Sequence, residues 1–381
     1  MINVLYVTYA SDNFDGATYS LMDLIKSVSG HVNPIVLLRT YGCVYDYFTT
    51  NGIECIVCDF QENLLHIPRN IHQLLCSLYR YLPNRISYYK RNKKCIENIY
   101  NQLNGRKIEI VHTNNTVMSV GYYIAKRMNA RHVWHLRGFM DLDFGWKPLI
   151  GWRNYKKEIL QSDAVIGITP TVLEHHISSS SSNAYSLFDA VRSKKDVCSI
   201  FPKEKYFLFC SGFLSKRKGC DFAIEAFAKS KLYTKGYRLR IVGEARDIYS
   251  KHLKSLLVNL SIAQYVDFIG RVDNVKDHMM HATAFLMCSE YEGLGRVSVE
   301  AMFYGCLVIG RNSGGTKDFI FDGETGFLFD DVEGCAEAMK KSILEDNNLI
   351  IKQAQEYASL NFSVEDYGEK ILLIYKKVLD K

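Results

Sequence analysis

Short apolar runs alternate with helix-like stretches along the whole chain, and this alternation restricts the fold more than any other feature of the sequence. In the first half the runs cover residues 4–8, 35–38, 53–57, 108–112, 132–136 and 164–168. In the second half they cover residues 206–210, 239–242, 265–269, 284–288 and 307–309. Strands separated by helices predict βαβ units and parallel sheets. Because there are two such series, we expect an α/β chain with two doubly wound, Rossmann-like domains.

The length of 381 residues agrees with two domains of ordinary size. A serine run at 178–183 and Pro202 indicate a linker between residues 183 and 205. The expected domains are residues 1–190, residues 200–361 and a C-terminal helix at 362–381.

The stretch 284–318 carries the strongest local signals. Its first strand ends in a glycine-containing loop with Glu292, and the helix that follows carries Glu300. Its second strand leads to residues 312–316, NSGGT, where we expect another helix to begin. In open α/β sheets ligands bind at the carboxyl ends of strands, and helix N-termini favour anions such as phosphates. A carboxylate accepts two hydrogen bonds at once, so both glutamates suit sugar diols. The alternative is two ordinary surface glutamates.

Residues 292–302 read EGLGRVSVEAM, and this segment resembles the E-x7-E signature of the retaining GT-B glycosyltransferases of family GT4, the "glycosyl transferases group 1". The segments GGTKD at 314–318 and DGETGFLF at 322–329 are similar to those that follow the signature in that family. The resemblance implies a GT-B fold, in which two Rossmann-like domains face a cleft. It places the acceptor on the first domain and the nucleotide-sugar on the second. The C-terminal helix would pack back on the first domain.

The resemblance also implies an activity. The enzyme would move a hexose-type sugar, with retention of configuration, from a nucleotide-diphospho-sugar, with UDP favoured and GDP next. The acceptor would be a glycan or a lipid-linked sugar in cell-surface polysaccharide synthesis. No metal and no cofactor are expected beyond the nucleotide-sugar co-substrate. Asp141 and Asp143 form a D-x-D, which we interpret as an acceptor-side loop feature, since two aspartates alone are a poor metal signal.

The expected catalytic cations follow the first strand of the second domain. Residues 212–219 read GFLSKRKG, where family members often have G-R-L-x-x-x-K-G. Lys218 matches the family lysine. Phe213 stands in place of the usual arginine, so Arg217 becomes the candidate for the second cation. Cations on a strand-to-helix loop suit a departing diphosphate.

The resemblance extends to the other donor contacts. Glu292 would bind the transferred sugar, Glu300 the ribose diol, and the backbone of Val272 the base. Gly16 begins a helix where the family has a G-G-A turn, although an ordinary tight turn in the loop 9–17 is an equal alternative. The full set of expected nucleotide-sugar-binding residues is Gly16, Gly212, Arg217, Lys218, Gly243, Val272, Glu292, Gly293, Leu294, Gly295, Arg296 and Glu300.

Two residues of the first domain complete the catalytic set of Glu292, Lys218 and Arg217. His135 and Arg137 project to one side of a strand that ends at the expected cleft. In the resembled family a histidine at the end of this strand lies near the transferred sugar, but here Arg137 falls at that position. His112 is a third candidate. For each, a buried hydrogen-bonded side chain is the alternative, and for His112 it is favoured.

Residues 66–107 are rich in cations with interleaved tyrosines. Glu97 is the single acidic residue of this stretch. Such a composition suits an anionic membrane surface or a diphosphate-linked lipid acceptor. A solvated charged face is equally compatible. Single-stranded nucleic acid would fit too, but the rest of the chain gives it no support, so no nucleic-acid partner is expected.

No stretch reaches the roughly 18–20 apolar residues of a membrane span. The N-terminus has no basic region before its apolar run and reads as a buried strand. We therefore expect a cytoplasmic protein, with peripheral attachment at the inner face of the membrane as an extension. The eleven scattered cysteines are expected to be reduced core residues.

Other function classes remain open from the sequence. A nucleotide-sugar epimerase or a pyridoxal-phosphate-dependent phosphorylase could use the same architecture. A non-catalytic nucleotide- or glycan-binding module is also compatible, because Phe213 and Arg137 depart from the family pattern. A Rossmann dehydrogenase is weaker, since Gly293-x-Gly295-x-x-Ser298 lacks the third glycine.

Overall fold

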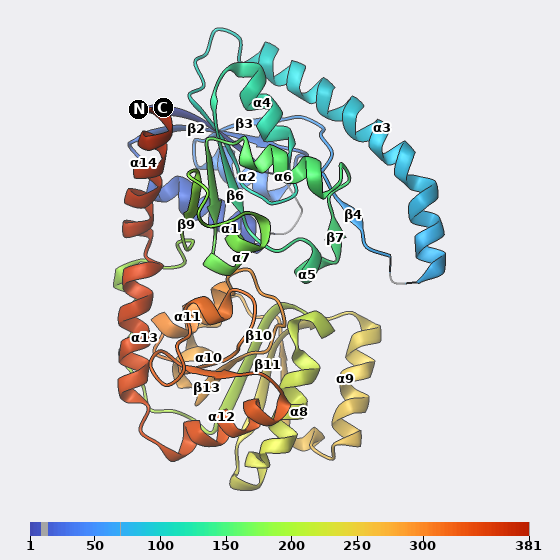
Figure 1. The fold of residues 1–381 in the computed structure, drawn as a ribbon. Helices are drawn as coiled ribbons and strands as arrows, with labels where there is room; N and C mark the ends of the chain where they lie inside the picture. Colours follow the sequence, from blue (N-terminus) through green and yellow to red (C-terminus); the bar gives the residue numbers. More distant parts are fainter. Residues whose placement is uncertain (9–13, 69, 381) are drawn as a thin grey trace. The chain divides into compact units, whose positions relative to one another are not determined.

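The computed structural model describes residues 1–8, 14–68 and 70–380. The chain divides into unit 1, Met1–Asp189 with Tyr367–Lys381, and unit 2, Ala190–Asp366. Each unit is built around its own parallel sheet (Figure 1). Residues 9–13, which belong to the predicted loop 9–17, and Arg69, which belongs to the basic stretch 66–107, lie outside the described residues.

The described part of unit 1 contains a seven-stranded sheet in the order β3-β2-β1-β5-β6-β8-β9, with every neighbouring pair parallel. The strands are β1 (Ile2–Val7), β2 (Val32–Leu38), β3 (Glu54–Val57), β5 (Ile110–Thr113), β6 (Arg131–Leu136), β8 (Ala164–Gly167) and β9 (Ala184–Ser186). The central strands are buried apolar runs because helices cover both faces. The strand order reverses between β1 and β5, which is where a ligand site is expected in such a sheet.

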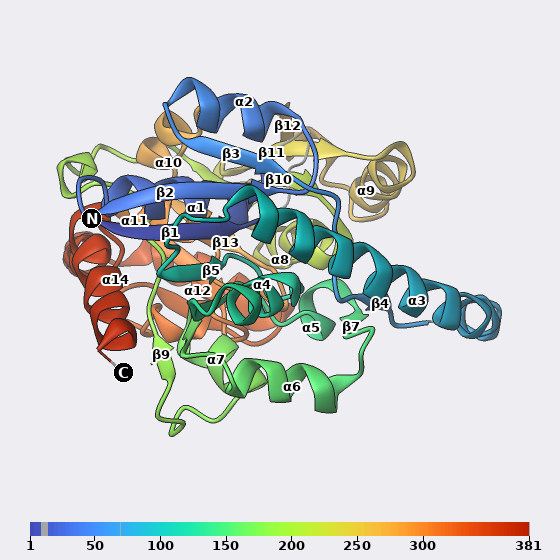
Figure 2. The same cartoon turned by 90° about the horizontal axis from the view of Figure 1, so that it is seen from above.

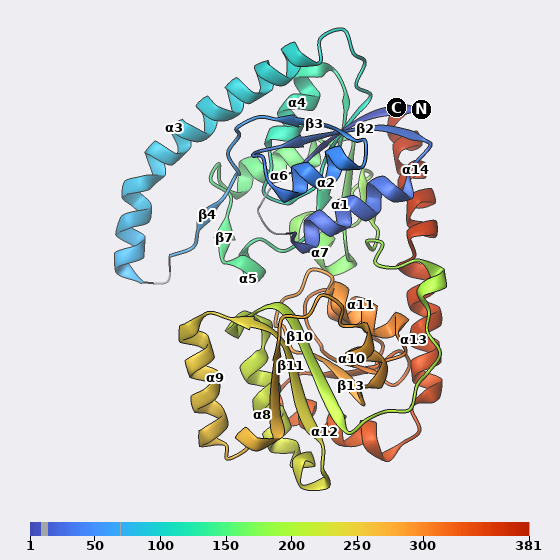
Figure 3. The same ribbon diagram turned by 180° about the vertical axis from the view of Figure 1, so that it is seen from behind.

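The helices of unit 1 are α1 (Gly16–Ser27), α2 (Cys43–Thr50), α3 (Ile71–Gln102), α4 (Val120–Met128), α5 (Asp141–Phe144), α6 (Trp152–Leu160), α7 (Pro170–His176) and most of α14 (Val364–Leu379). A small antiparallel pair joins β4 (Leu65–His66) to β7 (Trp146–Lys147). The helix α14 lies beside α1 (Figure 3), and a Cβ on Gly368 would lie 2.2 Å from the carbonyl oxygen of Ser27. The first half of α3 projects away from the rest of unit 1 (Figures 1 and 2).

The described part of unit 2 contains a six-stranded parallel sheet in the order β12-β11-β10-β13-β14-β15. The strands are β10 (Tyr206–Leu214), β11 (Arg238–Ala245), β12 (Val266–Gly270), β13 (Ala284–Met287), β14 (Val308–Arg311) and β15 (Phe327–Phe329). The helices are α8 (Cys220–Ser230), α9 (Asp247–Asn259), α10 (Lys276–His281), α11 (Arg296–Phe303), α12 (Val332–Leu344) and α13 (Asn348–Asn361). The order reverses between β10 and β13.

The two parallel sheets confirm the predicted α/β class, and they add elements that the sequence did not indicate. The three-residue strand β9 lies inside the stretch predicted as a linker. The sequence did not indicate it, because so short an edge strand needs no apolar run. The helix expected after residues 312–316 is wrong. The chain makes one 3-10 turn, η5 (Thr316–Asp318), and then returns to the sheet as β15.

Candidate functional site in unit 2

Lys218 and Glu292 meet where the strand order of unit 2 reverses. Lys218 ends the 3-10 turn η2 (Lys216–Lys218) after β10, and Glu292 lies in the loop after β13. The Nζ of Lys218 lies 2.8 Å from Oε2 and 3.1 Å from Oε1 of Glu292. Because β10 and β13 are neighbours, the loops that follow them lie together at one edge of the sheet. Lys218 and Glu292 were predicted as separate site residues, and their direct contact is a finding of the structure.

Gly219 lets the two loops pack closely. Its φ is +75°, and a Cβ at this position would lie 2.3 Å from the carbonyl oxygen of Cys288. The hydroxyl of Ser289 donates to the carbonyl oxygen of Lys218 at 3.4 Å. Both the backbone conformation and the space therefore require glycine directly after Lys218.

Electrostatics keep Glu292 ionised. Burial by itself would raise the pKa of this carboxyl, whose side chain is 19% exposed. Lys218, hydrogen bonds and the charge of Arg217 more than offset burial, so the pKa of Glu292 lies below its ordinary value. An ionised carboxylate that holds an ammonium group is thus the ground state of this site at neutral pH.

The glycine pair 314–315 packs against the backbone of the Glu292 loop. The N–H of Gly315 donates to the carbonyl oxygen of Glu292 at 2.7 Å. Gly314 has a φ of +55°, and a Cβ there would lie 2.8 Å from the backbone of Glu292. This segment therefore fixes the loop that carries Glu292.

Glu300 has a different cationic partner, which the sequence did not indicate. It lies on α11, which begins directly after Gly295, a residue with a φ of +76°. Its Oε1 accepts from Nη2 of Arg192 at 3.0 Å. On the same helix Arg296 donates from Nη1 to the carbonyl oxygen of Ala190 at 2.7 Å. Both α11 side chains thus bind the segment 190–192.

The remaining residues of unit 2 that were predicted to bind the nucleotide-sugar lie on loops or strand ends. Gly212 is exposed on β10, and Val272 lies in the loop after β12. Gly243 has a φ of +131°, and a Cβ there would lie 2.1 Å from the carbonyl oxygen of Ser211. Gly293 and Leu294 belong to the loop between Glu292 and α11. Arg217 is exposed beside Lys218.

A further arginine lies next to the residue that departs from the family pattern. The ring of Phe213 is 47% exposed near the end of β10. The guanidinium carbon of Arg246 lies 5.6 Å from the centroid of this ring. A cation therefore lies close to the place where the resembled family has its arginine.

In unit 1 the predicted residues His135 and Arg137 are buried in a polar network. Arg137 donates to Oδ1 of Asn114 from Nε at 2.9 Å and from Nη2 at 2.7 Å, and it forms an ion pair with Asp189. His135 Nε2 lies 3.5 Å from Oδ1 of Asp189. The hydroxyl of Tyr367 donates to the same carboxylate at 3.3 Å. Asp189, which the sequence did not single out, is thus shared by all three side chains.

His112 belongs to the same buried region. Its Nδ1 lies 2.7 Å from the hydroxyl oxygen of Tyr375 on α14, and that hydroxyl donates to Tyr6 at 3.2 Å. Burial, with Arg137 nearby, holds the pKa of both His112 and His135 well below the ordinary range. Both imidazoles are therefore neutral at physiological pH. The favoured structural interpretation of His112 agrees with this placement.

The other predicted features of unit 1 have local structural partners. Gly16 begins α1, and Asp15 caps this helix by accepting from the N–H of Thr18 at 2.8 Å. Asp143 is buried and accepts from the N–H of Phe139 at 3.0 Å, whereas Asp141 lies 2.7 Å from the ring of His175. Residues 141–144 form the short helix α5, not a loop.

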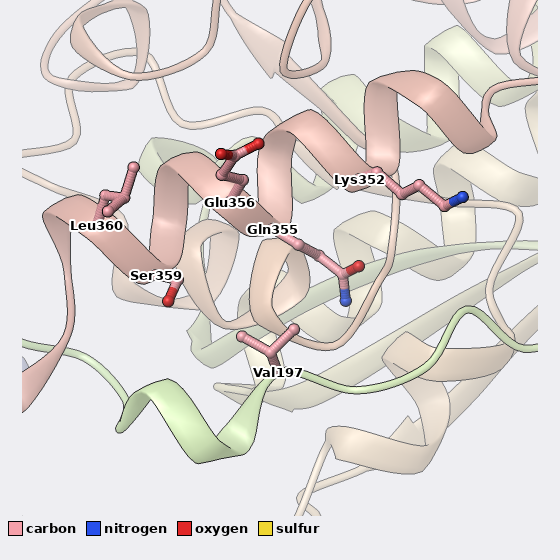
Figure 4. Close-up of a pocket in the computed structure, with 6 residues that line it drawn as sticks. All are labelled: Val197, Lys352, Gln355, Glu356, Ser359 and Leu360. Carbon is pink, nitrogen blue, oxygen red and sulfur yellow. The ribbon is translucent and has the colours of Figure 1, made fainter.

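A pocket in unit 2 lies away from these strand-end loops. Figure 4 shows its lining residues, Val197, Lys352, Gln355, Glu356, Ser359 and Leu360. The Gln355 amide donates to the carbonyl oxygens of Cys198 at 2.6 Å and Phe303 at 3.2 Å. Through these hydrogen bonds Gln355 holds α13 against the backbone at Cys198 and Phe303.

Helix α3 carries a row of exposed apolar side chains. Its apolar side chains recur every three or four residues and are exposed at Ile71, Leu74, Leu75, Leu78, Leu82, Ile86 and Tyr89. Another face, with Tyr88, Cys95 and Ile99, packs into unit 1. Two of the predicted basic residues are neutralised from outside the basic stretch, since Arg91 pairs with Asp59 and Arg106 with Glu54. No described helix is long and apolar enough to span a membrane.

Parts of this chain are similar to known glycosyltransferases. Residues 192–358 match the family model described as "Glycosyl transferases group 1". N-acetyl-alpha-D-glucosaminyl L-malate synthase of Bacillus anthracis is 24% identical over 87% of this chain and 89% of its own. The lipopolysaccharide core biosynthesis glycosyltransferase LpsE of Rhizobium meliloti is 30% identical over 40% of this chain and 44% of its own. The chain spans about half the length of several curated relatives that it matches.

The likeness to solved structures covers nearly the whole chain. HepE (Alr3699) of Anabaena, solved in complex with UDP, has a TM-score of 0.79 at 18% identity, and the match covers 98% of this chain and 100% of HepE. TarM of S. aureus has a TM-score of 0.75 at 13% identity, with 98% of this chain and 99% of TarM covered. The fold is GT-B. Residues 192–358 of this chain are similar to the glycosyl transferases group 1 family.

Proposed function

We propose that this protein is a retaining glycosyltransferase that moves a hexose-type sugar from a nucleotide-diphospho-sugar to a glycan or lipid-linked acceptor. The observation that carries the proposal is the Lys218–Glu292 pair at the strand-order reversal of unit 2. Nucleotides bind at this point of a doubly wound sheet. A lysine held there by a carboxylate supplies the positive charge that a leaving diphosphate requires.

Each residue of the site has a role in this reaction. Lys218, with Arg217, neutralises the diphosphate as the bond to the sugar breaks. Glu292 holds Lys218 in place and accepts hydrogen bonds from hydroxyls of the transferred sugar. Glu300 accepts from the ribose diol, because its carboxylate can take both hydroxyl hydrogens.

We favour a UDP-sugar donor, with a GDP-sugar next. HepE, whose fold this chain shares, was solved with UDP and with UDP-glucose. A role in cell-surface polysaccharide synthesis is supported by the similarity to LpsE. His135 and Arg137 act through the Asp189 network that orders the end of β6, and no metal is assigned to the reaction.

We further propose that α3 attaches the protein to an anionic membrane, where a lipid-linked acceptor would be available. Besides Arg91, which pairs with Asp59, the helix carries five cations and the single acid Glu97. These cations are Arg80, Arg85, Lys90, Lys93 and Lys94. Its exposed apolar row can insert among lipid chains while the flanking cations contact anionic headgroups.

The direct test is turnover. The protein is incubated with UDP-glucose, UDP-N-acetylglucosamine or GDP-mannose and a panel of glycan and lipid-linked acceptors, and nucleotide release is followed. Acceptor-dependent release with an α-linked product supports the proposal. Conversion of the nucleotide-sugar without acceptor would support an epimerase instead. Nucleotide binding with no turnover of any donor would support a non-catalytic module.

A further inference from the structure

Arg192 binds the second glutamate of the signature from a part of the chain that contains no recognised motif. Its Nη2 donates to Oε1 of Glu300 at 3.0 Å. The side chain of Glu300 is 15% exposed, and that of Arg192 is 36% exposed. The two residues are 108 positions apart, so tertiary folding alone brings them together.

The backbone on either side of Arg192 is fixed within unit 2. Its carbonyl oxygen accepts from the N–H of Val364 at 3.0 Å, and the N–H of Val191 donates to the carbonyl oxygen of Phe362 at 2.9 Å. The guanidinium carbon lies 5.7 Å from the ring centroid of Tyr304, one helical turn after Glu300. Arg192 therefore reaches Glu300 from an anchored position.

The same face of α11 makes a second contact with this segment. Arg296 and Glu300 are four residues apart and so lie on one face of the helix. Arg296 donates to the carbonyl oxygen of Ala190 at 2.7 Å. With α11 held at both points, the Glu300 carboxylate has a defined direction relative to the helix.

From these contacts we infer that Arg192 is a positioning residue, which orients the Glu300 carboxylate toward the vicinal diol of a nucleoside diphosphate. This inference rests on the proposed function. A carboxylate has about four acceptor positions, so one hydrogen bond from Arg192 is compatible with two more from a diol. A carboxylate fixed before binding loses less side-chain freedom when the ribose arrives, and this preorganisation strengthens binding.

The test compares UDP with its dideoxyribose analogue, which lacks the diol, by isothermal titration calorimetry. In Arg192→Ala we expect the affinity for UDP to fall about tenfold, which corresponds to ~1.4 kcal/mol. The affinity for the dideoxy analogue should change less than twofold. Arg192→Lys should recover part of the loss, because a lysine can still donate to Glu300. The matched control is Lys195→Ala, which removes the same charge from an exposed position three residues away.

A second measurement separates positioning from a general structural effect. On a Glu300→Ala background, Arg192→Ala should leave the remaining UDP affinity within twofold, since there is no carboxylate left to orient. If Arg192→Ala weakens UDP and the analogue equally, or neither, the inference is overturned while the donor site stands. If the unaltered protein binds neither UDP nor GDP, the proposed function fails and the inference fails with it.

Discussion

The ammonium nitrogen of Lys218 lies 2.8 Å from one carboxylate oxygen of Glu292, although the two residues are 74 positions apart. One follows β10 and the other follows β13, and these strands are neighbours where the order of the sheet reverses. The contact thus depends on the topology of unit 2. It brings a cation and an anion together at the edge where doubly wound sheets bind nucleotides.

Removing the Lys218 ammonium should impair the chemical step. We expect Lys218→Ala to lower kcat/KM for the nucleotide-sugar by about 10²–10³, as the loss of one preorganised charge at a developing negative charge does. The matched control is Lys216→Ala, an exposed lysine in the same turn, which should change kcat/KM less than threefold. Equal losses in both variants, measured by steady-state kinetics, would contradict a specific role for Lys218.

Gly219→Ala should be far more damaging than Gly323→Ala. Both glycines have φ near +75°, so both substitutions incur the left-handed backbone cost of ~1 kcal/mol. A Cβ at Gly219 would also meet the Cys288 carbonyl oxygen at 2.3 Å, whereas nothing lies within 4 Å of a Cβ at Gly323. We expect Gly219→Ala to lose at least about 2 kcal/mol more in calorimetric unfolding. Comparable losses would show that the two loops do not pack as described.

Unit 1 should lose stability as the pH falls from 7.5 to 5.5. Burial lowers the pKa of His132 to about 3 and of His176 to about 4, and it holds the pKa of His112 and His135 well below 6.5. The folded unit keeps these rings neutral, whereas the unfolded chain takes up protons below a pKa of about 6.5. Stability is therefore present above that pH and is lost below it, by about 1 kcal/mol for each histidine.

Fluorescence can follow this loss in unit 1 alone, because Trp134, Trp146 and Trp152 are the three tryptophans of the chain and all belong to this unit. Burial raises the pKa of Glu158, which opposes the trend, but it is one group against four. Denaturant unfolding at several pH values gives the slope of the free energy of unfolding against pH. His135→Gln should reduce the slope, and the exposed His31→Gln should not. A free energy of unfolding that does not change over this range would refute the assignment of neutral buried rings.

Charge placed on the exposed row of α3 should abolish membrane binding. Leu78 and Leu82 are 64% and 63% exposed, so Leu78→Glu with Leu82→Glu should leave the fold intact. We expect this variant to lose at least tenfold in partitioning to vesicles rich in phosphatidylglycerol, measured by co-sedimentation. The control variant carries Leu344→Glu and Leu349→Glu at similarly exposed positions in unit 2. If both variants bind as the unaltered protein does, α3 is not the attachment site.

The sequence predicted those parts of the molecule that depend on local pattern. Apolar runs bounded by glycine indicated the central strands of both sheets, because buried parallel strands are apolar on both faces. Lys218 and Glu292 were found because each follows such a strand at a recognisable glycine. Their contact was not predicted, because it depends on β10 and β13 being neighbours in the sheet.

Other features depend on tertiary contacts that leave no local signal. Arg192 meets Glu300 across 108 residues, and Asp189 joins Arg137 to Tyr367 in a network whose members come from three distant segments. Two cations of the basic stretch looked unbalanced, because Asp59, the partner of Arg91, and Glu54, the partner of Arg106, lie outside that stretch. The strand β9 was missed because an edge strand of three residues carries too short a pattern.

Thermal-shift titration with UDP, GDP and ADP tests most directly whether unit 2 holds a nucleotide-sugar site. At ~100 times its dissociation constant, the correct diphosphate should add about 2.7 kcal/mol of apparent stability. We expect one diphosphate to raise the Tm and Glu300→Ala to weaken this response. If none of the three shifts the Tm over a wide concentration range, or if Glu300→Ala responds like the unaltered protein, unit 2 does not hold a nucleotide-sugar site at α11.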